Sequence, residues 1–307
     1  MQLAGLHHVT MITGDARRNV EFWADVLGLR LVKKTVNFDQ PHAYHLYFGD
    51  ERGTPGSILT WFEFAGVGAG HAGAGMIHTL ALAVPGAAAF EFWHARLARR
   101  GHASELLEDR VRLHDPDGLA IELVAAHAGN PPLAAVHPEV GAANAIVGIE
   151  GARAYGAPDP AGAALLTDTL GFTARYDQEY LLDGTLRHFH WGYDPAPDTL
   201  GVQGAGTVHH IAWACEDSEQ LAWRARVAAA GAAVTGVRDR DYFKSIYFNE
   251  PRGVLFEIAT LSPGFAVDEE PGHLGEQLRI PAMHAHLRDE LERTLVPLTN
   301  PRAAALA

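Results

Sequence analysis

The stretch VHHIAWAC at residues 208–215 carries two adjacent histidines at the start of a short apolar run, and LHHVTMIT at residues 6–13 repeats the pattern. Short apolar runs of this kind are typical of β-strands. A third run, VLFEIAT at residues 254–260, contains Glu257. Together the three strands supply two imidazoles and one carboxylate, which is the facial triad of non-haem Fe(II) oxygenases. The sequence therefore predicts a metal-dependent enzyme.

Each pair of adjacent histidines offers one ligand to such a site. Successive side chains on a strand point to opposite faces, so only one histidine of a pair can reach a shared ion. His8 shares its strand face with Thr10, whereas His7 shares its face with Val9. Periodicity alone leaves open which of the two histidines binds.

Length and charge restrict the class of protein. The 307 residues are enough for two domains, and 48% of them are hydrophobic. The formal net charge of −13 argues against nucleic acid or an anionic membrane as partner, because both require clustered lysine and arginine. The single cysteine, Cys215, excludes an internal disulfide and fits a reducing compartment. Without a signal-peptide pattern or a membrane-spanning apolar run, we expect a cytoplasmic globular protein.

Four segments of the chain repeat one order of elements. Each begins with a strand, continues with a helix that has leucine, alanine and aromatic residues at helical spacing, and ends in short strands, which predicts a βαβββ module. The modules cover residues 6–64, 76–126, 145–194 and 207–260. The turns DPDGLAIEL and NEPRGVLFEI also repeat, and they place Glu122 and Glu257 in register. We therefore expect an α+β protein built from four modules.

The opening strands of the modules also align. This alignment predicts four equivalent positions, which are His8, His78, Gly148 and His210. The chain is then divided into residues 1–127 with modules one and two, and residues 143–261 with modules three and four. Residues 128–142 are rich in Pro and Gly and form a linker. Residues 262–307 form a C-terminal extension, with a surface helix in AMHAHLRDELERTL, that we expect to cover one barrel mouth.

Four such modules, with histidines in opening strands and a glutamate in a closing strand, resemble the vicinal oxygen chelate superfamily of glyoxalases, bleomycin resistance proteins and extradiol dioxygenases. Within it, nearly the whole chain is similar to the dioxygenases that cleave the ring of hydroquinones, including chlorinated and methylated ones. The matching stretches are LHHVTMITGDA, YHLYFGD, PGSILTWFEF, TVHHIAWA, DRDYFKSIYFNEPRGVLFEIAT and SPGFAVDEE. The resemblance implies a small aromatic diol and O₂ as substrates.

The resemblance also decides between the adjacent histidines. The family's metal ligands fall on His8, His210 and Glu257 of this chain. The ion implied is Fe(II), with Mn(II) as an alternative because it accepts the same nitrogen and oxygen ligands.

The family's polar residues around the ion fall on His7, Thr10, His209, Arg240 and Tyr247. We predict that His209 and Tyr247 hydrogen-bond oxygen atoms of the substrates and move protons. Arg240 is expected to orient one of those groups or to offset negative charge. Thr10 is expected to line the pocket.

Each metal cup in this fold is built from two modules. Because His8 lies in module one and both His210 and Glu257 lie in module four, these two modules must pair. Modules two and three then form the other barrel. We expect that barrel to lack a metal despite His78 and Glu122, since module three offers only glycine at its opening position.

Three other functions compete with this prediction. A glyoxalase-type isomerase needs a fourth protein ligand, for which Glu63 is the candidate, but alignment of the turn glycines places Thr60 opposite Glu257 instead. A catechol-cleaving enzyme would take its ligands from modules three and four, and Gly148 argues against it. A metal-free protein that binds aromatic compounds would not need the triad. A homo-oligomer is compatible with the sequence.

Overall fold

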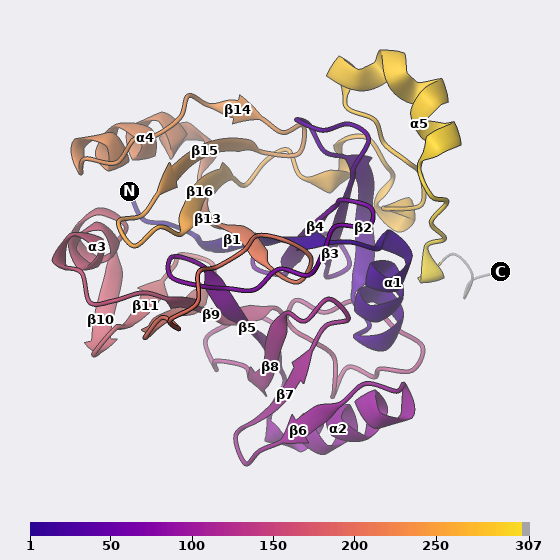
Figure 1. Ribbon diagram of the computed structural model, residues 1–307, viewed down its shortest axis with the longest axis horizontal. Helices are drawn as coiled ribbons and strands as arrows, with labels where there is room; N and C mark the ends of the chain where they lie inside the picture. Colours follow the sequence, from indigo (N-terminus) through magenta and orange to yellow (C-terminus); the bar gives the residue numbers. More distant parts are fainter. Residues whose placement is uncertain (303–307) are drawn as a thin grey trace.

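The computed structural model describes residues 1–302, which form two eight-stranded mixed sheets (Figure 1). The strands of the first sheet are β1 (Gly5–Thr13), β2 (Arg30–Val36), β3 (Tyr44–Gly49), β4 (Ile58–Glu63), β13 (Val208–Cys215), β14 (Arg238–Asp239), β15 (Lys244–Asn249) and β16 (Leu255–Thr260). They lie in the order β14-β15-β16-β13-β1-β4-β3-β2. The antiparallel pair β1 and β13 joins the two halves of the sheet. The predicted pairing of modules one and four is confirmed.

The second sheet has the same construction. Its strands are β5 (Ile77–Val84), β6 (Ser104–Leu106), β7 (Arg110–His114), β8 (Ala120–Ala125), β9 (Ile149–Tyr155), β10 (Phe172–Tyr176), β11 (Glu179–Asp183) and β12 (His188–Asp194). They lie in the order β10-β11-β12-β9-β5-β8-β7-β6, with β5 and β9 antiparallel at the centre. Modules two and three therefore pair, as the sequence predicts.

A helical segment follows the first strand of each module. These segments are α1 (Ala16–Val20) with the π-helical η1 (Glu21–Val26), the 3-10 turn η2 (Ala87–Ala89) with α2 (Phe90–Arg99), α3 (Pro160–Ala164) with the π-helical η3 (Leu165–Thr169), and the 3-10 turn η4 (Asp217–Glu219) with α4 (Gln220–Ala229). Asp15 caps α1 by accepting hydrogen bonds from two backbone N–H groups, and Asp159 caps α3 in the same way. No helix among the described residues has the length and apolarity to span a bilayer.

The two sheets share one apolar core. Trp213 of β13 packs against Phe189 and Trp191 of β12, with ring centroids 5.4 and 6.0 Å apart. The residue ranges 1–127 and 143–261 each contribute four strands to each sheet, so the two halves of the chain are interleaved. Residues 128–142 contain no helix or strand.

The C-terminal extension runs along the first sheet (Figure 1). Its short helices are η5 (Phe265–Val267), η6 (Pro271–His273), η7 (Ala282–Leu287) and α5 (Arg288–Thr294). The buried ammonium of Lys33 on β2 contacts the carboxylates of Asp268 and Glu269. Phe265 packs with Tyr47 in a small hydrophobic cluster. The extension thus covers the edge strand β2 and packs against Tyr47 of β3.

Candidate metal centre

Three neighbouring strands bring His8, His210 and Glu257 together. His8 Nε2 and His210 Nε2 are 3.3 Å apart, and Glu257 Oε2 lies 3.4 Å from the first and 2.9 Å from the second. All three side chains are buried. Among the described residues, they form the one cluster of His, Cys, Asp or Glu side chains whose ligand atoms converge in this way.

The geometry and chemistry of these three groups fit a divalent ion. Metal–ligand bonds of about 2.1 Å at right angles place neighbouring ligand atoms about 3 Å apart, close to the separations observed. Glu257 Oε2 is buried, and it lies within contact of Nε2 of His8 and Nε2 of His210. Burial alone would raise the pKa of Glu257, but His8 and His210 hold it well below its ordinary value. Buried charges are paired or coordinate metals, and a divalent ion among these three groups would supply positive charge beside the Glu257 carboxylate.

The neighbour in each histidine pair supports the ligand. His7 Nδ1 lies 2.9 Å from His8 Nδ1, and His209 Nδ1 lies 2.8 Å from His210 Nδ1. A ligand that binds metal through Nε2 carries its hydrogen on Nδ1, so it donates to the neighbouring ring. Burial lowers the pKa of His7 to about 3 and that of His209 to about 4, which keeps both acceptors neutral.

A cavity of about 320 Å³ opens over His8 and His210. Its apolar wall consists of Phe38, Phe62, Phe64, Phe243 and Leu255. A volume and lining of this kind suit a small aromatic molecule. Of the polar residues predicted from the sequence, four line the cavity, namely Thr10, His209, Arg240 and Tyr247. The fifth, His7, lies behind His8 and packs against Phe243 at a centroid distance of 4.7 Å.

Arg240 and Tyr247 act as a pair on the cavity wall. Arg240 Nε donates to the Tyr247 hydroxyl over 3.2 Å, and its guanidinium lies 3.6 Å from Asp39 at the cavity mouth. Because the hydroxyl oxygen accepts from Arg240, its own hydrogen remains available to a molecule in the cavity. Burial, followed by the charge of Glu257, raises the pKa of Tyr247, so the hydroxyl stays protonated.

His45, Tyr47 and Thr60 also lie at the site, although none of them is among the site residues predicted from the sequence. His45 and Tyr47 line the cavity, and Thr60 hydrogen-bonds to His45 and to Thr10. A signal existed in the repeat: Tyr47 pairs with Thr60 across β3 and β4 as Tyr247 pairs with Glu257 across β15 and β16.

The two sheets contain corresponding sites. We call the site of His8, His210 and Glu257 the first cup and the site around Glu122 the second cup. Glu257 and Glu122 each lie beside an alanine of the neighbouring parallel strand, which is Ala212 or Ala81 respectively. Two residues before that alanine the first sheet has His210. The second sheet has Thr79 at that place.

The residue opposite that alanine differs as well. The alanine of the first sheet pairs with His8, and the alanine of the second sheet pairs with Gly151. The prediction that His78 and Gly148 occupy the ligand positions was therefore wrong. His78 instead corresponds to the supporting histidine that precedes a ligand.

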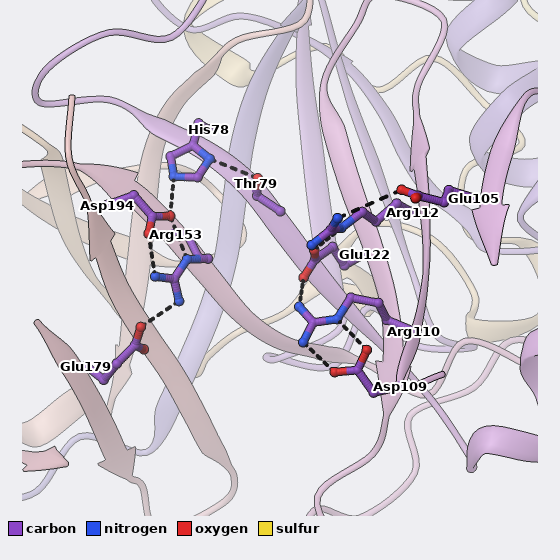
Figure 2. Close-up of polar contacts among 10 residues, drawn as sticks. All are labelled: His78, Thr79, Glu105, Asp109, Arg110, Arg112, Glu122, Arg153, Glu179 and Asp194. Atoms are coloured by element: carbon purple, nitrogen blue, oxygen red, sulfur yellow. Dashed lines mark hydrogen bonds and ion pairs between the residues drawn. The ribbon is translucent and has the colours of Figure 1, made fainter. Parts of the chain in front are cut away.

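Arginines occupy the second cup, as Figure 2 shows. Glu122 accepts from Arg110 over 2.6 Å and from Arg112 over 3.0 Å. Arg153 forms two hydrogen bonds with Asp194, each 2.7 Å long. Glu122 and Asp194 are thus paired with guanidinium groups, and a threonine and a glycine stand at the two positions that are histidines in the first sheet.

Comparison with known proteins gives consistent matches over the whole chain. The sequence profile of the Glyoxalase/Bleomycin resistance protein/Dioxygenase superfamily matches residues 5–123 and 160–258. MhqO of Bacillus subtilis (strain 168), provisionally named a ring-cleaving dioxygenase, is 40% identical over 306 residues, covering 95% of this chain and 96% of the relative. The chlorohydroquinone/hydroquinone 1,2-dioxygenase of Sphingobium indicum is 30% identical over 328 residues, covering 96% of each chain.

One crystal structure matches equally well. It is that of a provisionally named dioxygenase from Bacillus subtilis subsp. subtilis str. 168, with a TM-score of 0.89 and 38% sequence identity. The match covers 97% of this chain and 98% of the other. The fold of this chain is therefore shared by that crystal structure along nearly its full length.

Proposed function

This chain belongs to the Glyoxalase/Bleomycin resistance protein/Dioxygenase superfamily, and we propose that it is a dioxygenase that cleaves the ring of a hydroquinone with Fe(II) held by His8, His210 and Glu257. The names of the relatives support the reaction class, and one of them names hydroquinones as its substrates. The observation that carries the proposal is a triad of ligands, open on one side, at the base of a cavity with aromatic walls.

The open side separates this proposal from a glyoxalase-type isomerase. Such an isomerase would need a carboxylate as a fourth protein ligand, and the corresponding place holds Thr60, which pairs with Thr10 on β1. Glu63 lies three residues further along β4, so its side chain points to the opposite face of the strand. Three protein ligands leave up to three coordination positions for substrate and O₂.

A hydroquinone imposes a specific demand on the protein. Its two hydroxyl groups lie at opposite ends of the ring, so one ion cannot bind both. The ring would lie between Phe62 and Phe243, and the second oxygen atom would be held by side chains of the cavity. The bound ion supplies the redox chemistry that allows O₂ to react with a ring whose electrons are all paired.

The polar side chains of the cavity would hold the oxygen atoms and transfer protons. Tyr247 donates its hydrogen to a substrate oxygen and is oriented by Arg240, whose positive charge offsets the charge that develops there. His209 accepts from His210 at Nδ1, so its Nε2–H is the second donor that faces the cavity. Thr10 contributes a hydroxyl beside His210.

The test is oxygen uptake by apo-protein loaded anaerobically with Fe(II), Mn(II) or Zn(II). The substrates are hydroquinone, methylhydroquinone, chlorohydroquinone and catechol. We expect uptake that depends on Fe(II) or Mn(II), with a hydroquinone as substrate and with both atoms of isotopically labelled O₂ in a ring-opened product. Turnover with Zn(II) and no oxygen uptake would favour the isomerase. No uptake with any metal would overturn the proposal.

A further inference from the structure

A row of hydrogen bonds runs along the cavity wall from module one to the proposed metal ligand His210. Tyr47 OH lies 2.9 Å from His45 Nδ1, and His45 Nε2 lies 2.9 Å from Thr60 Oγ1. Thr60 Oγ1 lies 3.0 Å from Thr10 Oγ1, which in turn lies 3.0 Å from His210 Nε2. All five side chains are buried.

The chemistry of these groups fixes the direction of the row. Thr60 donates its one hydroxyl hydrogen to Thr10, so its oxygen must accept from His45 Nε2–H. A neutral imidazole carries one N–H, so His45 Nδ1 must accept from the Tyr47 hydroxyl. Burial holds the pKa of His45 well below its ordinary value, which keeps the ring neutral.

Thr10 stands at the end of the row and has only one hydrogen to donate. Its oxygen already accepts from Thr60. An ion bound to His210 Nε2 takes the lone pair that the Thr10 hydroxyl would otherwise reach. The hydrogen of Thr10 is then left for an oxygen atom in the cavity, which Thr10 lines.

We propose that His45 is a positioning residue that acts through Thr60 to make Thr10 a one-way hydrogen-bond donor to a phenolate oxygen in the cavity. The inference rests on the proposed function, because it assumes a metal on His210 and an ionised phenol beside it. Its consequence is selectivity: the pocket favours a deprotonated hydroxyl of an aromatic diol over a neutral ether of the same shape.

The opposite half of the sheet explains why this row exists. There, Tyr247 pairs with Glu257, whose Oε1 accepts from Ser245. In module one, Tyr47 pairs with Thr60, and His45 stands where the other half has its serine. A hydroxyl that takes the place of a carboxylate ligand does not hold the ion, but a neighbouring histidine can fix the direction in which that hydroxyl donates its hydrogen bond.

The experiment measures binding rather than turnover. Protein loaded with Zn(II), which has no redox chemistry, is titrated anaerobically with 4-nitrophenol at a pH above that at which the free phenol ionises. The visible absorbance of the phenolate reports its dissociation constant. 4-Nitroanisole, which cannot ionise, is titrated by competition as the neutral probe of the same shape.

The inference predicts a selective loss of phenolate affinity. We expect His45→Leu and Thr60→Val each to weaken 4-nitrophenolate binding about tenfold, because one hydrogen bond to a charged oxygen is lost or misdirected. 4-Nitroanisole should bind to these variants as it does to the wild type. His45→Gln should retain most of the affinity, since its amide can donate to Thr60 and accept from Tyr47.

A matched control comes from the second cup, where His78 Nδ1 lies 2.9 Å from the Thr79 hydroxyl. His78→Leu should leave both dissociation constants unchanged. The inference is overturned if His45→Leu or Thr60→Val binds the phenolate like the wild type, or if both probes weaken equally. Thr60→Val preserves side-chain shape, so it decides the matter even if His45→Leu does not fold. Failure of the protein to bind Zn(II) would instead contradict the proposed function.

Discussion

The two cups of this protein occupy the same places in two sheets of the same construction, yet only one has the residues of a metal site. In the first cup, the two histidine positions are His8 and His210. In the second, the corresponding residues are Gly151 and Thr79. The glutamate position is glutamate in both. The comparison teaches that the fold supplies converging positions, and that side-chain identity decides whether a cation is needed there.

The surviving glutamate of the second cup shows how that need is removed. Glu122 is bound by Arg110 and Arg112, so guanidinium groups supply the positive charge. Glu257 has no arginine or lysine within ion-pairing distance among the described residues, and its Oε2 faces Nε2 of His8 and Nε2 of His210. A carboxylate at the same place in both sheets therefore does not by itself indicate the same kind of site.

The most direct test of this difference between the two cups is to replace each glutamate in turn. We expect Glu257→Ala to lower metal affinity at least hundredfold, because one of three ligands is lost, and to abolish oxygen uptake. Glu122→Ala should leave metal affinity unchanged. Competition with a chromophoric chelator measures both. Equal losses in the two variants would mean that the second cup also binds metal.

The next largest effect is expected on the stability of the first sheet, where the C-terminal extension packs. Lys33 lies fully buried against Glu269 of the C-terminal extension. Lys33→Met would remove the cation nearest to that buried carboxylate and leave Arg279, 3.9 Å away, as its remaining cation among the described residues, so we expect the free energy of unfolding to fall by about 3–5 kcal/mol. Denaturant unfolding measures the change. A loss below about 1 kcal/mol would show that the extension is held by its other contacts.

The hydroxyl opposite the glutamate distinguishes the cups chemically. Tyr247 faces Glu257 across the strands, and Arg112 takes that place opposite Glu122. Tyr247→Phe should lower kcat about ten- to hundredfold, the effect of losing one hydrogen bond to a charged oxygen, with metal content unchanged. Steady-state oxygen uptake measures it. A variant with wild-type kcat would remove Tyr247 from the proposed mechanism.

The smallest effect is expected in the second cup itself. Arg112 is about half exposed, so its ion pair with Glu122 is screened by solvent. Arg112→Gln should change the free energy of unfolding by no more than about 1 kcal/mol and leave kcat unchanged. Thermal unfolding and oxygen uptake provide the two readings. A fall in kcat would give the second cup a role in the reaction.

The pairing of the modules could be predicted because His8 lies in one module and Glu257 in another, and both must reach one ion. The correspondence between Thr79 of the second sheet and His210 of the first could not be predicted. The register shifts between Leu6 and His8 in one sheet, and between Ile77 and Thr79 in the other. Such irregularities change which residue faces the cup, and intervals along the chain do not reveal them.

The role proposed for His45 could not be predicted from the sequence either, for a different reason. Its partner Thr60 lies on the next strand, and their contact depends on how β3 and β4 pair. A lone histidine in an apolar strand has no pattern that separates packing from function. The triad was easier because two of its members repeat the same two-histidine motif.

The central claim is that the first cup, through a set of ligands that includes Glu257, binds the ion needed for the reaction with O₂. It is tested most directly by measuring oxygen uptake with hydroquinone while apo-protein is titrated with Fe(II). We predict that uptake saturates at one Fe(II) per chain in the wild type and in Glu122→Ala, and that Glu257→Ala shows none. Saturation at two Fe(II) per chain, or uptake that survives in Glu257→Ala, would contradict the account.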